Sequence, residues 1–93
     1  MSLLSTGTAL FEVPDRSAGV RLRRRVRPRP VAFGHRKDVD LVLVDFGDDN
    51  DDLAVLLRDV QEWVAEEGLE AIWFELDGRT YLLQPRARIA PSG

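Results

Sequence analysis

The chain has 93 residues, of which 44% are hydrophobic and 31% are charged, and this is the composition of one globular domain. It contains no cysteine, which excludes a disulfide framework, a thiolate metal site and a cysteine nucleophile and fits a reducing compartment. Its longest apolar runs are far shorter than the roughly 18 residues that suggest a membrane span. We therefore expect a single domain over residues 1–93, located in the cytoplasm and without a membrane segment.

The first 37 residues predict a basic hairpin or arm. The apolar patterns of residues 8–13 and 20–26 indicate two strands, joined by a loop over residues 14–19. Pro28 and Pro30 interrupt regular pairing, so the segment leading into residues 31–33 is expected to be an edge strand or an extended connector.

The middle of the chain predicts a strand followed by a helix. Residues 41–46 form an aliphatic run without polar alternation until its end, which is typical of a strand buried on both faces. Acidic residues over 48–52 can cap the helix that follows, and Gly68 can end it, with Leu69 folding back onto the last turn. The apolar residues of this helix recur at the spacing of one helical face: Leu53, Leu56, Leu57, Val60, Trp63 and Val64.

The Asp77-Gly78 dipeptide predicts a β-hairpin between residues 71–76 and 79–84. In the two-residue register, Trp73 lies opposite Leu82 on the sheet face that points away from the helix. That face is half apolar, so the N-terminal segment or another chain must cover it. The residues expected to face the helix are Ile72, Phe74, Leu76, Tyr81 and Leu83.

These elements together predict an α+β fold with a mixed sheet of four to five strands and one main amphipathic helix on one face. A hairpin comes first, a β-α-β-β unit follows over residues 38–85, and residues 86–93 form a flexible tail. The sheet is expected to be mixed because the connection from residues 41–46 through the helix to residues 70–76 should be a right-handed parallel crossover.

Charge is divided along the chain. Residues 1–37 hold nine basic and two acidic residues, whereas residues 38–93 hold four basic and fourteen acidic ones, for a net charge of −3. On a strand, four arginines of the basic part would project from one face: Arg21, Arg23, Arg25 and Arg27. Such a stripe could bind phosphates, pair with acids of the same molecule, protect a sheet edge, or dock the acidic part of a second copy.

Catalytic and metal-binding patterns are absent from the sequence. The acidic segment from Asp45 to Asp52 fits no EF-hand register, and helix capping explains it more simply. His35 is the single histidine, no serine lies in a nucleophile motif, and the glycines form no phosphate-binding loop. We therefore predict no catalytic residue, no metal and no cofactor. A divalent-metal-dependent enzyme built on Asp45 and Asp48 is the least favoured alternative.

The resulting hypothesis is a non-catalytic protein-interaction or assembly module that self-associates or belongs to a larger complex. Trp73 and Leu82, together with the separated charge, are the features expected to bind the partner. The alternative is a nucleic-acid-binding accessory protein that uses the arginine-rich segment 21–29 on phosphates.

Overall fold

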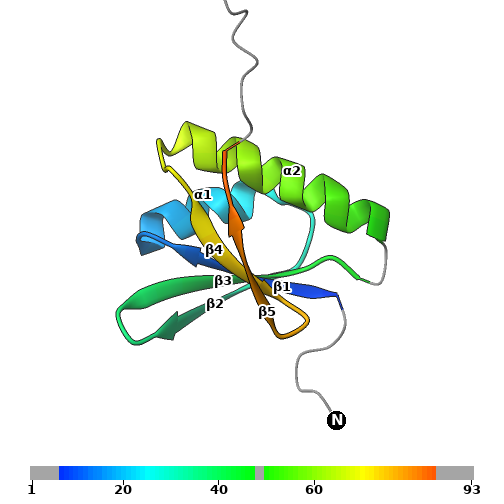
Figure 1. Cartoon of the computed structure of the whole chain (residues 1–93), viewed down its shortest axis with the longest axis horizontal. Helices are drawn as coiled ribbons and strands as arrows, with labels where there is room; N and C mark the ends of the chain where they lie inside the picture. Colours follow the sequence, from blue (N-terminus) through cyan, green and yellow to red (C-terminus); the bar gives the residue numbers. More distant parts are fainter. Residues whose placement is uncertain (1–6, 48–49, 86–93) are drawn as a thin grey trace, which may run out of the picture.

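Strands and helices follow one another in the order β-α-β-β-α-β-β (Figure 1). The computed structural model describes residues 7–47 and 50–85, so the tail expected over residues 86–93 lies outside the described residues. The predicted α+β class, with a five-stranded sheet and one main helix, is confirmed. The elements are β1 (Thr8–Val13), α1 (Arg16–Arg25), β2 (Val31–Arg36), β3 (Val39–Asp45), α2 (Asn50–Glu66), β4 (Ile72–Leu76) and β5 (Arg79–Leu83).

The five strands form one sheet in the order β2-β3-β1-β4-β5, and every neighbouring pair is antiparallel. β3 and β4 run in the same direction, as the connection through α2 requires, but β1 lies between them and is antiparallel to both. The sheet is therefore antiparallel rather than mixed, because β1 occupies its centre. The first four strands and both helices follow the ferredoxin-like split β-α-β connectivity, to which β5 adds an edge strand.

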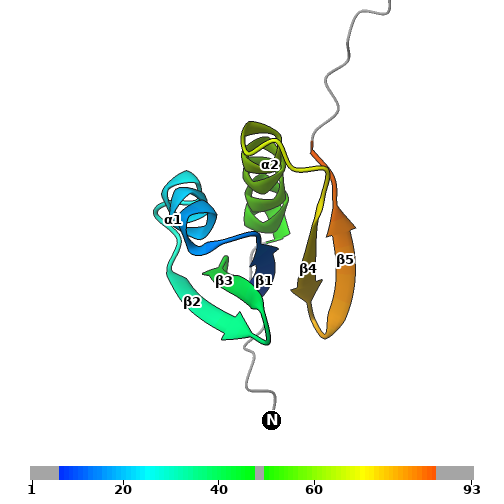
Figure 2. The same ribbon diagram turned by 90° about the vertical axis from the view of Figure 1, so that its left-hand side faces the viewer.

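Both helices pack on the same face of the sheet (Figure 2). Their buried residues and those of the strands form one continuous hydrophobic cluster between the two layers. No described element lies over the opposite face, which we call the open face.

Residues 16–25 form helix α1, so the N-terminal hairpin predicted for residues 8–26 is wrong. Asp15 caps this helix by accepting a hydrogen bond from the backbone N–H of Ala18 (Oδ1···N 2.8 Å). Ala18, Leu22 and Val26 recur every four residues and are all buried. The basic residues of the last turn, at positions 23–25, are favourable at the negative end of the helix dipole. The four-residue apolar spacing thus outweighs the pattern of residues 20–26 that suggested a strand.

Residues 31–36 form β2, an edge strand of the sheet. It pairs with β3 through the turn at Lys37 and Asp38. The edge position expected after Pro28 and Pro30 is confirmed, because an edge strand needs ladder hydrogen bonds on one side only.

Helix α2 confirms the predicted amphipathic helix and its predicted end. Gly68 adopts a left-handed backbone conformation with φ of 71°. The backbone N–H of Gly68 donates to the carbonyl of Ala65 (3.1 Å), and that of Leu69 donates to the carbonyl of Val64 (3.1 Å). This is the Schellman arrangement, which satisfies the last helical carbonyls. Leu69 also packs against the core, as its position after the glycine predicts.

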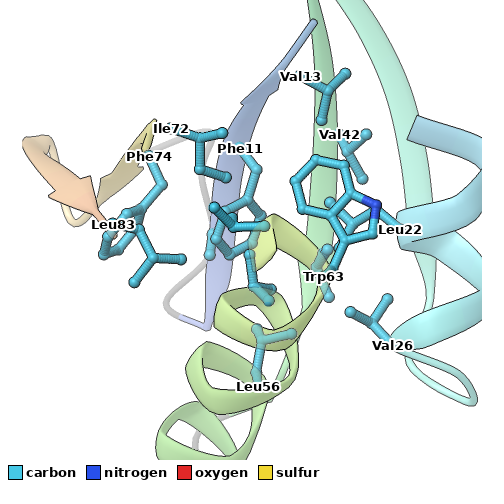
Figure 3. Packing of buried hydrophobic residues seen from close by; sticks show 14 of the residues in the cluster. Phe11, Val13, Leu22, Val26, Val42, Leu56, Trp63, Ile72, Phe74 and Leu83 are labelled. Carbon is cyan, nitrogen blue, oxygen red and sulfur yellow. The ribbon is translucent and has the colours of Figure 1, made fainter. Parts of the chain in front are cut away.

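The core lies between the sheet and the helices (Figure 3). Phe11 of the central strand is fully buried and stacks on Phe74, with ring centroids 5.5 Å apart. Trp63 of α2 is fully buried as well and lies beside Leu22 and Val26. Its indole Nε1–H has no hydrogen-bond partner among the described residues, so Trp63 stabilises the fold through its buried area.

Gly19 allows α1 to approach the sheet closely. A Cβ atom at this position would lie 3.2 Å from Cγ2 of Val42, 3.4 Å from Cε1 of Phe33 and 3.5 Å from Cγ2 of Val13. Glycine inside a helix normally costs about 1 kcal/mol relative to alanine. Here the missing side chain makes room for the contact between α1 and three strands.

We expect Gly19→Val to lower the free energy of unfolding by about 1–3 kcal/mol, because the added methyl groups overpack this contact. Urea denaturation followed by circular dichroism measures the change. Ser17→Val places the same side chain at an exposed position of α1 and should change the free energy by only about 0.5 kcal/mol. Equal decreases in the free energy of unfolding of the two variants would show that position 19 is not tightly packed against the sheet.

Candidate functional site

Trp73 and Leu82 lie side by side on the open face. They are a directly opposed pair of the β4–β5 hairpin, in the register predicted from the Asp77-Gly78 turn. Both side chains are 49% exposed. Helix α1 does not cover them, because it packs on the other face of the sheet. The N-terminal part of the described chain therefore leaves this pair in contact with solvent.

The alternate residues of the hairpin point toward the helices, as predicted. Ile72, Phe74 and Leu83 are buried in the core, and Leu76 is partly buried against it. Tyr81 stacks on Phe74, with ring centroids 5.3 Å apart, but stays 41% exposed because β5 is the edge strand.

The centre of the open face is shielded although no described element lies over it. Leu10 of β1 and Leu41 of β3 belong to this face by their register, yet both are buried. Arg36 of β2 reaches across β3 and β1 to Glu75 of β4 (Nη1···Oε2 2.9 Å). The large exposed apolar side chains of the open face are consequently those of the β4–β5 hairpin.

A cleft opens beside Trp73, where β1 and β4 cease to pair. Their ladder ends at the pair formed by Phe11 and Phe74, so the strands separate beyond this point. The cleft has a volume of about 300 Å³. The carboxylates of Glu12 and Asp38 line it, and neither forms an ion pair with another described residue. Its other walls are apolar and include Val13, Pro14, Val39, Leu69 and Ile72.

The four arginines predicted to share a strand face do not form one stripe on α1. Arg21 donates to both carboxylate oxygens of Glu67, just after the end of α2 (Nη2···Oε1 2.7 Å). Arg25 lies 3.4 Å from a carboxylate oxygen of Glu62 and 2.8 Å from one of Glu66. Half of the predicted stripe is therefore paired with acids of the same chain.

Arg29 makes the most buried of these contacts. Its guanidinium donates to both oxygens of Asp52 (2.8 and 3.1 Å) and lies 3.5 Å from Asp59, and its side chain is only 12% exposed. Arg29 is not among the four arginines predicted to bind a partner, although it continues the four-residue spacing of Arg21 and Arg25. We call these three arginines, with Glu67, Glu62, Glu66, Asp52 and Asp59, the interhelical clamp.

Arg23, Arg24 and Arg27 are exposed and form no ion pair with any described residue. Arg23 and Arg24 belong to α1, and Arg27 lies in the turn that follows it, beside Arg29. We call Arg23, Arg24 and Arg27 the outer arginines.

The acidic segment has ordinary structural contacts where it is described. Asp45 is exposed and accepts a hydrogen bond from the backbone N–H of Gly47 (2.9 Å), whereas Asp48 lies outside the described residues. His35 contacts Asp40 (Nδ1···Oδ1 3.2 Å). Within residues 7–47 and 50–85, no three His, Cys, Asp or Glu side chains gather closely enough to hold a metal ion. No helix in those ranges is long and apolar enough to cross a membrane.

No family model, curated protein or solved structure matches the chain. Because a shared fold would not by itself define an activity, function must be inferred from the chemistry of these surfaces.

The interhelical clamp shifts the pKa values of Arg21, Arg29, Asp52 and Glu67. Hydrogen bonding to Arg21 lowers the pKa of Glu67, and hydrogen bonding to Arg29 lowers the pKa of Asp52. The same contacts raise the pKa values of both arginines. Since the two carboxyl pKa values are lower in the folded chain than in the unfolded chain, the charged carboxylates stabilise the fold above the usual carboxyl range. This contribution is lost as the pH falls through the folded-state pKa values.

We expect the melting temperature to fall on acidification from about pH 6 to about pH 3, because the unfolded chain then binds more protons at these carboxylates. Glu67→Gln should reduce this dependence, since it removes one carboxylate whose pKa the clamp depresses. Thermal unfolding at a series of pH values measures the slope of melting temperature against pH for the wild type and for the variant. The matched control is Glu70→Gln, because Glu70 is exposed and forms no ion pair with a described residue. Identical slopes in the two variants would rule out a stabilising role for the Glu67 pair.

Proposed function

We propose that the protein is a small, non-catalytic interaction module that self-associates through Trp73 and Leu82. The supporting observation is that this cross-strand pair is half-exposed on a sheet face that no described helix covers. Tryptophan is enriched among the residues that dominate binding energy, and exposed apolar patches of this kind are typical of interaction sites. The side chains gathered at this face supply apolar area and charge rather than a nucleophile with an adjacent base.

A second copy of the chain is the partner that the charges favour. The outer arginines present unpaired positive charge, and Glu12 and Asp38 present unpaired negative charge beside Trp73. Complementary surfaces on one chain favour a head-to-tail contact, in which α1 and the following turn of one copy meet the open face of the next. We place this assembly in the cytoplasm, where a chain without cysteine needs no oxidising environment.

Nucleic-acid binding is the second candidate function, and the outer arginines are the observation that favours it. Of the four predicted phosphate contacts, Arg23 and Arg27 form no ion pair with a described residue, and the same holds for Arg24. Arg21 and Arg25 would have to leave their carboxylate partners to contact phosphates. The net charge of −3 also repels nucleic acid, so self-association is the preferred proposal.

We expect the molar mass of the wild-type protein to rise with concentration at low salt, and Trp73→Ala to remain monomeric while keeping its fold. The physical reason is that the variant loses the apolar anchor of the contact but no core packing. Sedimentation velocity measures the mass, with absorbance at 260 and 280 nm recorded to detect bound nucleic acid. Val55→Ala is the matched control, because Val55 is 47% exposed on α2, away from the open face. A wild-type protein that stays monomeric at every concentration would refute self-association, and co-purifying nucleic acid that is lost at high salt would favour the second candidate.

Mixing two variants tests the head-to-tail geometry. The triple variant R23Q/R24Q/R27Q retains the open face, and Trp73→Ala retains the outer arginines. Each should be monomeric alone, whereas the mixture should form a 1:1 complex that dissociates at high salt. Formation of a dimer by the triple variant alone would instead indicate a symmetric contact between two open faces.

A further inference from the structure

We propose that the cleft between β1 and β4 binds the guanidinium group of an arginine side chain, stacked on the Trp73 ring and paired with Glu12 and Asp38. This inference deepens the proposed self-association and rests on it, because it specifies which chemical group of the partner the open face recognises.

The shape of the cleft suits one extended side chain. Its volume of about 300 Å³ lies at the lower end of the range for ligand pockets. The walls contributed by Pro14, Val39 and Leu69 are apolar, and they can cover the aliphatic stem of a long side chain while its polar end meets the carboxylates. The β1–β4 ladder ends at Phe11 and Phe74, and the cleft lies beyond this pair, where the two strands are no longer hydrogen-bonded to each other.

The charge of the cleft favours a cation as its ligand. Glu12 and Asp38 come from different elements, β1 and the β2–β3 turn, and converge on the same space. The nearby Arg36 is engaged by Glu75, so it does not neutralise them. No arginine, lysine or histidine of residues 7–47 and 50–85 lines the cleft. Two carboxylates without a described counter-ion, set against apolar walls, favour a cationic ligand over an anionic or neutral one.

Trp73 favours arginine over lysine as the source of that cation. A guanidinium is planar and weakly hydrated, so it stacks on an indole ring and still donates two parallel hydrogen bonds to a carboxylate. An ammonium group is strongly hydrated and cannot form the same bidentate contact. The half-exposed indole beside two carboxylates therefore matches the arginine side chain better.

The chain itself supplies suitable donors. The outer arginines are exposed and form no ion pair with a described residue, so a second copy can offer one of them without breaking an internal contact. Arg21, Arg25 and Arg29 are unsuitable, because the interhelical clamp holds them.

The test measures the binding of two small ligands to the full chain, at a protein concentration where the chain is monomeric. In both ligands the amino and carboxyl ends are blocked, so that only the side chain can carry a charge. N-acetyl-arginine amide carries the guanidinium, and N-acetyl-citrulline amide has the same shape without the charge. We expect arginine amide to move the indole N–H signal of Trp73 saturably in a nitrogen-15 NMR titration. The indole signal of the buried Trp63 should stay in place and serves as an internal control. Citrulline amide should bind at least about tenfold more weakly, since it cannot pair with the carboxylates.

Variants assign the binding to the cleft. E12Q/D38N should weaken arginine amide at least about tenfold, and Trp73→Leu, which keeps an apolar side chain, should weaken it several-fold. Asp77→Asn is the matched control, because it removes one carboxylate in the β4–β5 turn outside the cleft and suits the positive φ of 53° there. Its affinity for arginine amide should equal that of the wild type.

Two results would overturn the inference: the absence of a saturable Trp73 shift, or equal binding of the two probes. Both can occur while sedimentation still shows self-association that depends on Trp73, in which case the proposed function survives and the cleft is not its recognition site. The converse result, arginine binding by a protein that never self-associates, supports the cleft as an arginine site and refutes the second copy as its source.

Discussion

The packing of α1 against α2 places both helices on one face of the sheet and leaves the open face uncovered by any described element. Leu22 and Val26 lie beside Trp63 in the core, and the interhelical clamp joins the outer sides of the two helices. A single exposed ion pair contributes little to stability, so the buried apolar area supplies most of the free energy of this contact. Of the three arginines of the clamp, Arg21 and Arg25 lie on α1 and Arg29 lies in the turn that follows it, so the ion pairs run along the outer side of this contact. Because α1 is committed to this face, no described element remains to cover the open face.

The opposite charges of the two parts of the chain are partly paired inside the molecule. The basic segment and the acidic helix, far apart in sequence, become the two sides of the interhelical clamp. Arg36 and Glu75 similarly join a basic and an acidic segment across the open face. The charged side chains that form no ion pair with a described residue include the outer arginines and, on another surface, the cleft carboxylates. Charged side chains that lie outside these ion pairs are available to a partner.

Local signals predicted the elements whose partners are near in sequence. The Asp77-Gly78 turn determines the pairing of Trp73 with Leu82, and the apolar spacing of α2 is long enough to be unambiguous. α1 was harder to predict, because Gly19 suggested a loop. The reason for a glycine at this position is the close approach of α1 to the strands, which only the folded structure shows. The cleft could not be predicted, since it depends on where β1 and β4 separate. Glu12 and Asp38 are brought together by that tertiary geometry alone.

The central position of β1 has a consequence for how the protein is made. β1 is synthesised before its two neighbours, which begin at Val39 and Ile72, 26 and 59 residues after Val13. Phe11 can be buried in full only after β4 has been synthesised, because it stacks on Phe74. During translation, β1 therefore cannot form a stable folded unit with the segments that directly follow it. β1 lacks one of its two neighbours until β4 has been synthesised, and the centre of the sheet can close only then.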